Sequence, residues 1–266
     1  MRLHILGCSG GLGGSSATPG ATGTRPQRTS SFLLDHDILI DAGTGVEDLD
    51  IEALSQIDHV FISHSHLDHI SALPLMLDTV GSIRTKPVTV HALPETIAAL
   101  KAHIFNWIIW PDFTEIPHYD RPWMVFNPLV LNEPVRIGER SIRPIPANHT
   151  VPAAGFHISG PQGSIVYSGD TWPDEEFWRI VNGIPDLRYL IIETAFANRE
   201  SDLAVTAKHL YPIELARQLD RMRVDARVLI THLKPSHREL ITREIDAWAG
   251  RFSPAILETG DIIRVE

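Results

Sequence analysis

The sequence predicts an α/β fold in which two β-sheets pack face to face and helices cover both outer surfaces, an αββα four-layer sandwich. Two observations predict it. Short apolar runs typical of strands recur from the first residues to the last, and they are densest near the N-terminus. Helical patterns then alternate with the later strands, which favours helices outside two packed sheets over a single doubly wound sheet.

The predicted strands are short apolar runs rich in β-branched residues and separated by turn-forming residues. In chain order they are Leu3–Leu6, Phe32–Leu34, Ile38–Ile40, Val60–Ser63, Val88–His91, Ile142–Ile145, Ile165–Ser168, Tyr189–Ile192, Val228–Thr231 and Ile262–Val265. His36-Asp37 is expected to make the tight turn between the second and third strands. Helical periodicity marks Pro94–Phe105, Pro212–Met222 and Arg238–Trp248. The Gly/Ser/Thr/Pro-rich stretch Ser9–Arg28 is predicted to be a loop, either flexible or wrapped over a site.

The length of 266 residues suits one domain with a sizeable core, so residues 1–266 are expected to form a single domain. Residues 103–128 stand apart because they hold half of the six tryptophans in a segment interrupted by prolines. We interpret this aromatic segment as an insertion held down by its own rings or as a dimer contact. A lid whose rings stack on a nucleobase is the alternative interpretation.

The composition is that of a globular protein, with 43% hydrophobic and 21% charged residues. No apolar run approaches the roughly 20 residues of a membrane span, and the N-terminus shows no secretory signal. The single cysteine, Cys8, excludes an internal disulfide framework and is expected to be a packed core thiol. We therefore expect a cytoplasmic protein with no membrane partner.

The net charge of −10 argues against a nucleic-acid partner, because such proteins neutralise phosphates with clusters of Lys and Arg. Here the 23 basic residues are scattered along the chain. A small anion held by metal ions remains open as a substrate. A homodimer is a further expectation, since oligomers are common among enzymes of this kind.

A strong metal motif, His-x-His-x-Asp-His, follows the predicted strand Val60–Ser63. It comprises His64, His66, Asp68 and His69. Two imidazoles placed two residues apart at the end of a strand can turn toward one point, and zinc, iron and manganese accept such nitrogen and oxygen ligands. A lone histidine is more often structural, but this spacing is specific enough to predict a metal site.

One such cluster cannot complete the shells of two metal ions, so further ligands are needed. Three candidates each follow a predicted strand, namely His149, Asp170 and His232. Any one alone would be interpreted as a capping or turn residue. Three with the same arrangement of strand followed by ligand indicate a common edge of the sheets.

This ordered set of ligands resembles the metallo-β-lactamase superfamily, and the match runs from Leu3 to the C-terminus. The stretch Ile40-Asp41-Ala-Gly also resembles the structural Asp-containing turn of that fold. The resemblance implies two divalent metal ions, with Zn²⁺ expected and Mn²⁺ or Fe²⁺ as alternatives. By resemblance, one ion is held by His64, His66 and His149, the other by Asp68, His69 and His232, and Asp170 bridges them.

Within the superfamily the chain resembles the class II cyclic-nucleotide phosphodiesterases. The similar stretches are Leu6-Gly-Cys-Ser-Gly-Gly, Ser31-Phe-Leu-Leu, Leu39-Ile-Asp-Ala-Gly-Thr-Gly, His64-Ser-His-Leu-Asp-His-Ile-Ser-Ala-Leu, Ser168-Gly-Asp-Thr, Ile192-Glu-Thr-Ala-Phe-Ala-Asn-Arg, Lys208-His-Leu and Thr231-His-Leu-Lys-Pro. The resemblance implies hydrolysis of the 3′ phosphoester bond of a small 3′,5′-cyclic nucleotide such as cAMP or cGMP to the 5′-monophosphate. Trp172 and Tyr211 depart from the family pattern, which has Gly and Thr there, and both are expected near the substrate.

A second resemblance concerns Glu193 and His209. They fall where the related tRNA 3′-processing endonucleases carry a Glu–His pair that protonates the leaving oxygen. Phosphodiester cleavage needs such an acid because the departing alkoxide is a poor leaving group. The plain interpretation is a residue at a strand end and another before a helix. The catalytic residues implied are therefore Asp68, Asp170, Glu193 and His209.

Other functions compete with this hypothesis. A tRNA 3′-endonuclease would carry a long arm between the third histidine motif and the bridging Asp, and positions 149 and 170 are too close for one. A hydrolase of a lactone, a thioester or a β-lactam shares the fold, so the fold cannot decide between them. A non-catalytic binding module is disfavoured because all seven candidate ligands are present.

Overall fold

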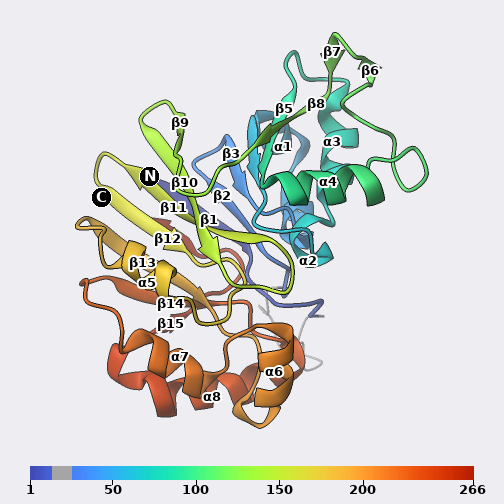
Figure 1. Ribbon diagram of the computed structural model, residues 1–266. Helices are drawn as coiled ribbons and strands as arrows, with labels where there is room; N and C mark the ends of the chain where they lie inside the picture. The colour runs from blue at the N-terminus through green and yellow to red at the C-terminus, as the bar shows by residue number, and fades with distance from the viewer. Residues whose placement is uncertain (14–25) are drawn as a thin grey trace.

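The computed structural model describes residues 1–13 and 26–266, in which two sheets face each other between two layers of helices (Figure 1). Helices α1, α3 and α4 lie on the outer side of one sheet, and α5, α7 and α8 lie on the outer side of the other. The predicted αββα four-layer fold is confirmed. Residues 14–25 of the loop predicted over Ser9–Arg28 lie outside the described residues.

The first sheet contains, within the described ranges, seven strands in the spatial order β16-β1-β2-β3-β4-β5-β8. Their bounds are β1 (Arg2–Gly7), β2 (Ser31–Leu34), β3 (Ile38–Ile40), β4 (His59–Phe61), β5 (Val88–Ala92), β8 (Met124–Pro128) and β16 (Ile262–Arg264). The tight turn at His36-Asp37 joins β2 to β3 as predicted. Strands β3, β4, β5 and β8 are parallel, so β4 delivers the chain to the same edge as its neighbours.

The second sheet has, in the part of the chain that the structure covers, the order β15-β14-β13-β12-β11-β10-β9. Its strands are β9 (Val135–Ile137), β10 (Arg140–Ala147), β11 (Ala153–Gly160), β12 (Gly163–Tyr167), β13 (Leu187–Glu193), β14 (Arg227–Thr231) and β15 (Ala255–Ile256). Strands β12, β13 and β14 are parallel, and β11 is antiparallel to both β10 and β12. Strands β10, β12, β13 and β14 therefore all end at one edge, where parallel sheets place their binding sites.

The helices are short and lie mainly between strands. Their bounds are α1 (Ile51–Gln56), α2 (Leu67–Ile70), α3 (Leu73–Gly81), α4 (Pro94–His103), α5 (Glu175–Val181), α6 (Ser201–Ala207), α7 (Pro212–Leu219) and α8 (Arg238–Ala249). The predicted helices at 94–105 and 212–222 end earlier than expected, at His103 and Leu219. Among the described residues, no helix is long and apolar enough to cross a bilayer.

Three hydrophobic clusters separate the four layers. Neighbouring residues of one strand belong to different clusters, because successive side chains point to opposite faces of a sheet. Leu33 of β2 packs with α1, α3 and α4 in the first cluster, whereas its neighbours Phe32 and Leu34 pack between the sheets. Leu190 and Ile192 of β13 likewise pack against α5, α7 and α8 in the third. The buried strands thus lie between two apolar layers, and this packing on both faces restricts the positions of their ends.

The aromatic segment 103–128 divides into buried and exposed parts. Phe105 and Phe113 are fully buried against the first cluster, while Trp107 and Ile108 are exposed. The segment also contains the short pair β6 (Pro117–His118) and β7 (Arg121–Pro122), and it ends in β8 at the edge of the first sheet. Rings holding the segment in place agree with the sequence-based interpretation, and a dimer contact or a lid stays a prediction.

Candidate metal centre

The residues predicted to bind metal converge at the shared edge of the two sheets. His64 follows β4, His66 is the residue before α2, and Asp68 and His69 lie within α2. The other three follow the ends of β10, β12 and β14, and they are His149, Asp170 and His232. The strand directions explain this convergence, because each strand ends at the edge where its neighbours end.

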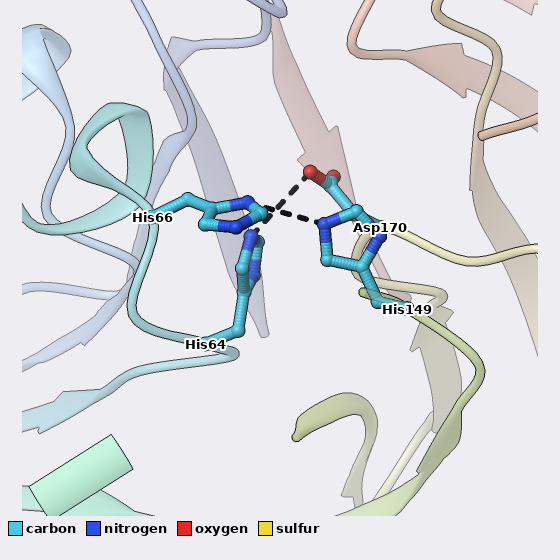
Figure 2. A group of neighbouring side chains, drawn as sticks. All are labelled: His64, His66, His149 and Asp170. Atoms are coloured by element: carbon cyan, nitrogen blue, oxygen red, sulfur yellow. Dashed lines mark hydrogen bonds and ion pairs between the residues drawn. The ribbon is translucent and has the colours of Figure 1, made fainter. Parts of the chain in front are cut away.

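His64, His66, His149 and Asp170 form the first group, with ligand atoms that all lie within 4.8 Å of one another. Figure 2 shows them approaching from two sides, the first two from the loop after β4 and the others from the second sheet. His64 Nε2 lies 3.6 Å from Asp170 Oδ2, and His149 Nε2 lies 3.1 Å from His66 Nδ1. The group has the size of one metal shell.

Asp68, His69 and His232 form a second group of three residues, whose ligand atoms also lie within 4.8 Å of one another. Asp68 Oδ2 lies 3.9 Å from His69 Nε2 and 3.7 Å from His232 Nε2. Asp170 Oδ2 lies 3.3 Å from the Nε2 atoms of both histidines. A single oxygen of Asp170 is thus near nitrogens of both groups, as a bridging ligand would be.

Hydrogen bonds at the far side of each ring determine which nitrogen carries the proton. His69 Nδ1 donates to Asp41 Oδ2 at 2.7 Å, and His149 Nδ1 donates to the Lys208 carbonyl at 3.3 Å. Ser63 Oγ already donates to Asp41 at 2.8 Å, so it accepts from His64 Nδ1 at 3.0 Å. The Nε2 atoms of these three histidines therefore present lone pairs to the centre, as metal-binding histidines do.

The centre contains buried polar atoms that the protein itself leaves without partners. Within the described residues, Nε2 of His64, His69 and His232 and Oδ1 of Asp170 make no hydrogen bond. Buried polar atoms are almost always satisfied, so converging lone pairs of this kind require a positive partner. Imidazole nitrogens and carboxylate oxygens are ligands for Zn²⁺, Mn²⁺ and Fe²⁺. The donor set therefore fits two divalent metal ions.

Asp41 supports both the turn and the centre. It is fully buried, has a left-handed φ of 57°, and accepts from the Ser63 amide at 2.7 Å. Asp tolerates this conformation better than most residues. The turn Ile40-Asp41-Ala-Gly is predicted by the sequence, but its contact with His69 is not, because nothing in the motif links positions 41 and 69.

The charges of the centre reinforce one another. Burial opposes ionisation of Asp170, but His232 and His69 outweigh it and hold the pKa of this carboxyl well below its ordinary value. Burial likewise lowers the pKa of His69, but Asp170 and Asp41 raise it well above the ordinary value, so a divalent ion binding at Nε2 would displace a proton from this ring. Asp170 is therefore ionised at neutral pH and attracts positive charge to the point between the two groups.

The Glu193–His209 pair lies beside the metal groups. Glu193 Oε1 accepts from His209 Nδ1 at 2.9 Å, and also from the amides of Thr171 and Leu210. The His209 ring stacks on the His232 ring, with centroids 5.3 Å apart. Burial lowers the pKa of His209, but the adjacent Glu193 carboxylate outweighs it and raises that pKa. His209, Asp170 and His232 also offer ligand atoms within 4.8 Å, so a metal-binding role competes with an acid role.

Three further residues border the centre. The rings of Trp172 and Tyr211, the two departures from the family pattern, lie 6.3 Å apart and are half-buried. Lys208 contacts the segment that carries His149, and in the sequence it stands out only as part of a family-like stretch.

Cys8 lies in the core between the sheets, and burial raises the pKa of its thiol to about 12, which confirms a packed core thiol.

A family model described as "Beta-lactamase superfamily domain" matches residues 36–233. A probable 3′,5′-cyclic-nucleotide phosphodiesterase of Yersinia pestis is 29% identical over 211 residues, which are 69% of this chain and 59% of that protein. The 3′,5′-cyclic-nucleotide phosphodiesterase 1 of Saccharomyces cerevisiae is 27% identical over 71% of this chain and 60% of its own length. The chain thus spans about three fifths of these relatives. A nuclear ribonuclease Z of Triticum aestivum is 31% identical over 38% of this chain and 54% of its own.

Solved structures share the fold over nearly the whole chain. Unliganded yeast PDE1 superimposes with a TM-score of 0.77 at 20% identity, covering 98% of each chain. The metallo-beta-lactamase fold protein YhfI from Bacillus subtilis gives 0.73 at 17% identity and covers 99% of each. Human tRNase Z, short form, gives 0.69 at 17% identity and covers 100% of each. At these identities the likeness establishes the metallo-β-lactamase fold.

Proposed function

The chain belongs to the beta-lactamase superfamily, and from this membership we propose that it is a metal-dependent phosphodiesterase acting on a 3′,5′-cyclic nucleotide. It would hydrolyse the 3′ phosphoester bond of cAMP or cGMP and release the nucleoside 5′-monophosphate. The observation that carries the proposal is the buried Glu193–His209 pair, 2.9 Å apart, directly beside the metal groups. A thioester, by contrast, releases a thiolate, which departs without protonation, so its hydrolysis does not need such an acid.

We assign His64, His66 and His149 to one ion and Asp68, His69 and His232 to the other, with Asp170 between them. Zn²⁺ is the ion that a set rich in imidazole nitrogens favours, with Mn²⁺ and Fe²⁺ as alternatives. When bound, two divalent ions would lower the pKa of a shared water and neutralise charge on the phosphate.

The side chains of this chain supply the proton and the orientation. His209 would protonate the departing 3′-oxygen from Nε2, because Nδ1 is engaged by Glu193. Glu193 is itself fixed by the Thr171 and Leu210 amides, so the imidazole has little freedom to rotate. The Asp68 side chain is 25% exposed whereas that of Asp170 is 2% exposed. Asp68 is thus the carboxylate that can contact the attacking water from the open side.

The tRNA 3′-processing endonuclease remains the second candidate, because the Triticum aestivum relative is named a ribonuclease Z. The chain between His149 and Asp170 forms the hairpin of β11 and β12. That hairpin lies wholly within the second sheet and leaves no room for a long arm. Together with the net charge of −10, this favours a small cyclic nucleotide over a nucleic acid as partner.

A comparison of two chromogenic substrates tests the class of bond. The metal-loaded protein is expected to cleave bis(4-nitrophenyl) phosphate in preference to 4-nitrophenyl acetate, because the centre is built for an anionic phosphodiester. Chelation should abolish this activity, and added Zn²⁺ should restore it. Faster cleavage of the acetate would instead indicate a hydrolase of carboxylic esters, lactones or thioesters.

A further inference from the structure

Lys208 has an unusual backbone conformation at a sensitive place. It ends α6 with φ 54° and ψ 52°, in the left-handed region that residues other than Gly rarely adopt. The turn is closed by Lys208 N–H donating to Val205 O at 3.2 Å and His209 N–H donating to Ala204 O at 2.9 Å. Such conformations persist only where the surroundings hold them, and they gather at functional sites.

Three hydrogen bonds join Lys208 to the segment Asn148–His149. Its ammonium donates to Asn148 Oδ1 at 2.9 Å and to the His149 carbonyl at 3.0 Å. Its own carbonyl accepts from His149 Nδ1 at 3.3 Å. One residue therefore holds both the backbone and the ring of His149, and the ring contact keeps the proton on Nδ1, so that Nε2 carries the lone pair.

Asn148 extends this connection to the segment that carries Asp170. Its amide donates to Thr171 Oγ1 at 3.0 Å, and its carbonyl accepts from the Trp172 amide at 2.8 Å. The side-chain nitrogen of Asn148 donates to the Pro173 carbonyl at 3.2 Å. Lys208 thus links three chain segments, which carry His149, Asp170 and His209.

We propose that Lys208 is a positioning residue of the metal centre. Its ammonium and carbonyl together hold His149 so that Nε2 faces His66 Nδ1, 3.1 Å away, and completes the first metal group shown in Figure 2. The inference rests on the metal centre of the proposed function and is independent of the substrate. Partners of this kind, which orient a ligand from behind, commonly affect metal affinity about 10–100-fold.

The charge of Lys208 does not explain its presence. Within the described residues its side chain bonds to neutral carbonyl oxygens, and no salt bridge is formed. An ammonium near a centre that gathers divalent cations repels them. Loss of the charge alone would therefore strengthen metal binding, whereas loss of the oriented donors would weaken it. The two explanations predict opposite changes.

Competition titration of the metal-free protein with Zn²⁺ against a chromophoric chelator separates these explanations. Lys208→Met removes the donors and keeps the chain length, and Lys208→Gly also relieves the left-handed strain. We expect both variants to bind one of the two Zn²⁺ equivalents about 10–100-fold more weakly than the unmodified protein. The second equivalent, held by Asp68, His69 and His232, should be affected much less.

Lys234→Met is the matched control. Lys234 lies two residues after His232 and donates to the Gly10 carbonyl at 2.5 Å, but it contacts none of the candidate ligands. Because the charge of Lys234 acts on Asp68 and His209, its removal should leave both affinities unchanged or slightly tighter, the opposite of the effect expected at Lys208. Circular dichroism should show that all three variants are folded. Unchanged or tighter Zn²⁺ binding in Lys208→Met would overturn the proposal. So would normal binding in Lys208→Gly, which would assign the effect to backbone strain. Failure of the unmodified protein to hydrolyse a cyclic nucleotide would refute the proposed function and leave this titration unaffected.

Discussion

Asp170→Ala is expected to remove metal from both groups and to reduce phosphodiester hydrolysis by well over about 10²-fold. One oxygen of Asp170 lies 3.3 Å from Nε2 of both His69 and His232, and 3.6 Å from Nε2 of His64. Loss of a mere supporting partner behind a ligand already weakens metal sites about 10–100-fold, so loss of a shared ligand should exceed that. Metal content per chain after gel filtration and the rate on bis(4-nitrophenyl) phosphate give the two readouts.

Asp174→Ala is the control for this substitution, since Asp174 lies in the same loop but caps α5. Its side chain accepts from the Phe177 amide, and loss of such a cap lowers stability by about 0.5–2 kcal/mol. Metal content and turnover should survive it. Asp170→Asn keeps the volume of the side chain and guards against simple misfolding. Full metal content in folded Asp170→Ala would remove Asp170 from its place between the ions.

His209→Ala is expected to depend on the leaving group. Hydrolysis of a cyclic nucleotide should fall by about 10²–10⁴-fold, the usual contribution of a general acid. Hydrolysis of bis(4-nitrophenyl) phosphate should fall far less, because 4-nitrophenolate leaves without a proton. His209 is suited to this role because the Glu193 carboxylate raises its pKa against the effect of burial.

Metal content distinguishes the acid role of His209 from the role of a ligand. His209 has atoms within reach of Asp170 and His232, so a ligand is geometrically possible. If His209 is the acid, the Ala variant retains both ions and loses activity mainly on the cyclic nucleotide, whose leaving group needs a proton. His237→Ala is the control, because His237 pairs with Glu200 outside the centre. Equal losses on both substrates, or loss of metal, would contradict the acid role.

Local sequence patterns predict the layers and the candidate ligands. Each ligand segment follows a short apolar strand, and the register of parallel strands then brings their ends together. For this reason His64 and His232, far apart in the chain, are expected at one edge on the basis of sequence alone. The fold prediction rests on the short apolar runs and on the helical patterns between the later ones. The division of β2, where Leu33 faces one cluster and Phe32 the other, follows only once the two sheets pack together.

The supporting contacts cannot be predicted in the same way, because they depend on tertiary geometry. Ser30 Oγ approaches His232 Nδ1 at 3.3 Å across 202 positions, and no local motif links the two. The left-handed conformation at the end of α6 falls on Lys208 and not on a Gly or Asn, the residues that usually mark such a helix end in a sequence. Strand β11 is not predicted either, since Gly155 and His157 interrupt its apolar run. Gly155 is required there because a Cβ would lie 2.5 Å from the Tyr167 carbonyl oxygen.

The most direct test of the account is the conversion of 3′,5′-cyclic AMP by the purified, metal-loaded protein, with chelated protein alongside. Metal-dependent formation of 5′-AMP is the expected result, because His209 would protonate the departing 3′-oxygen. An absence of turnover, with bis(4-nitrophenyl) phosphate still cleaved, would contradict the cyclic-nucleotide assignment and leave a metal-dependent phosphodiesterase with another substrate.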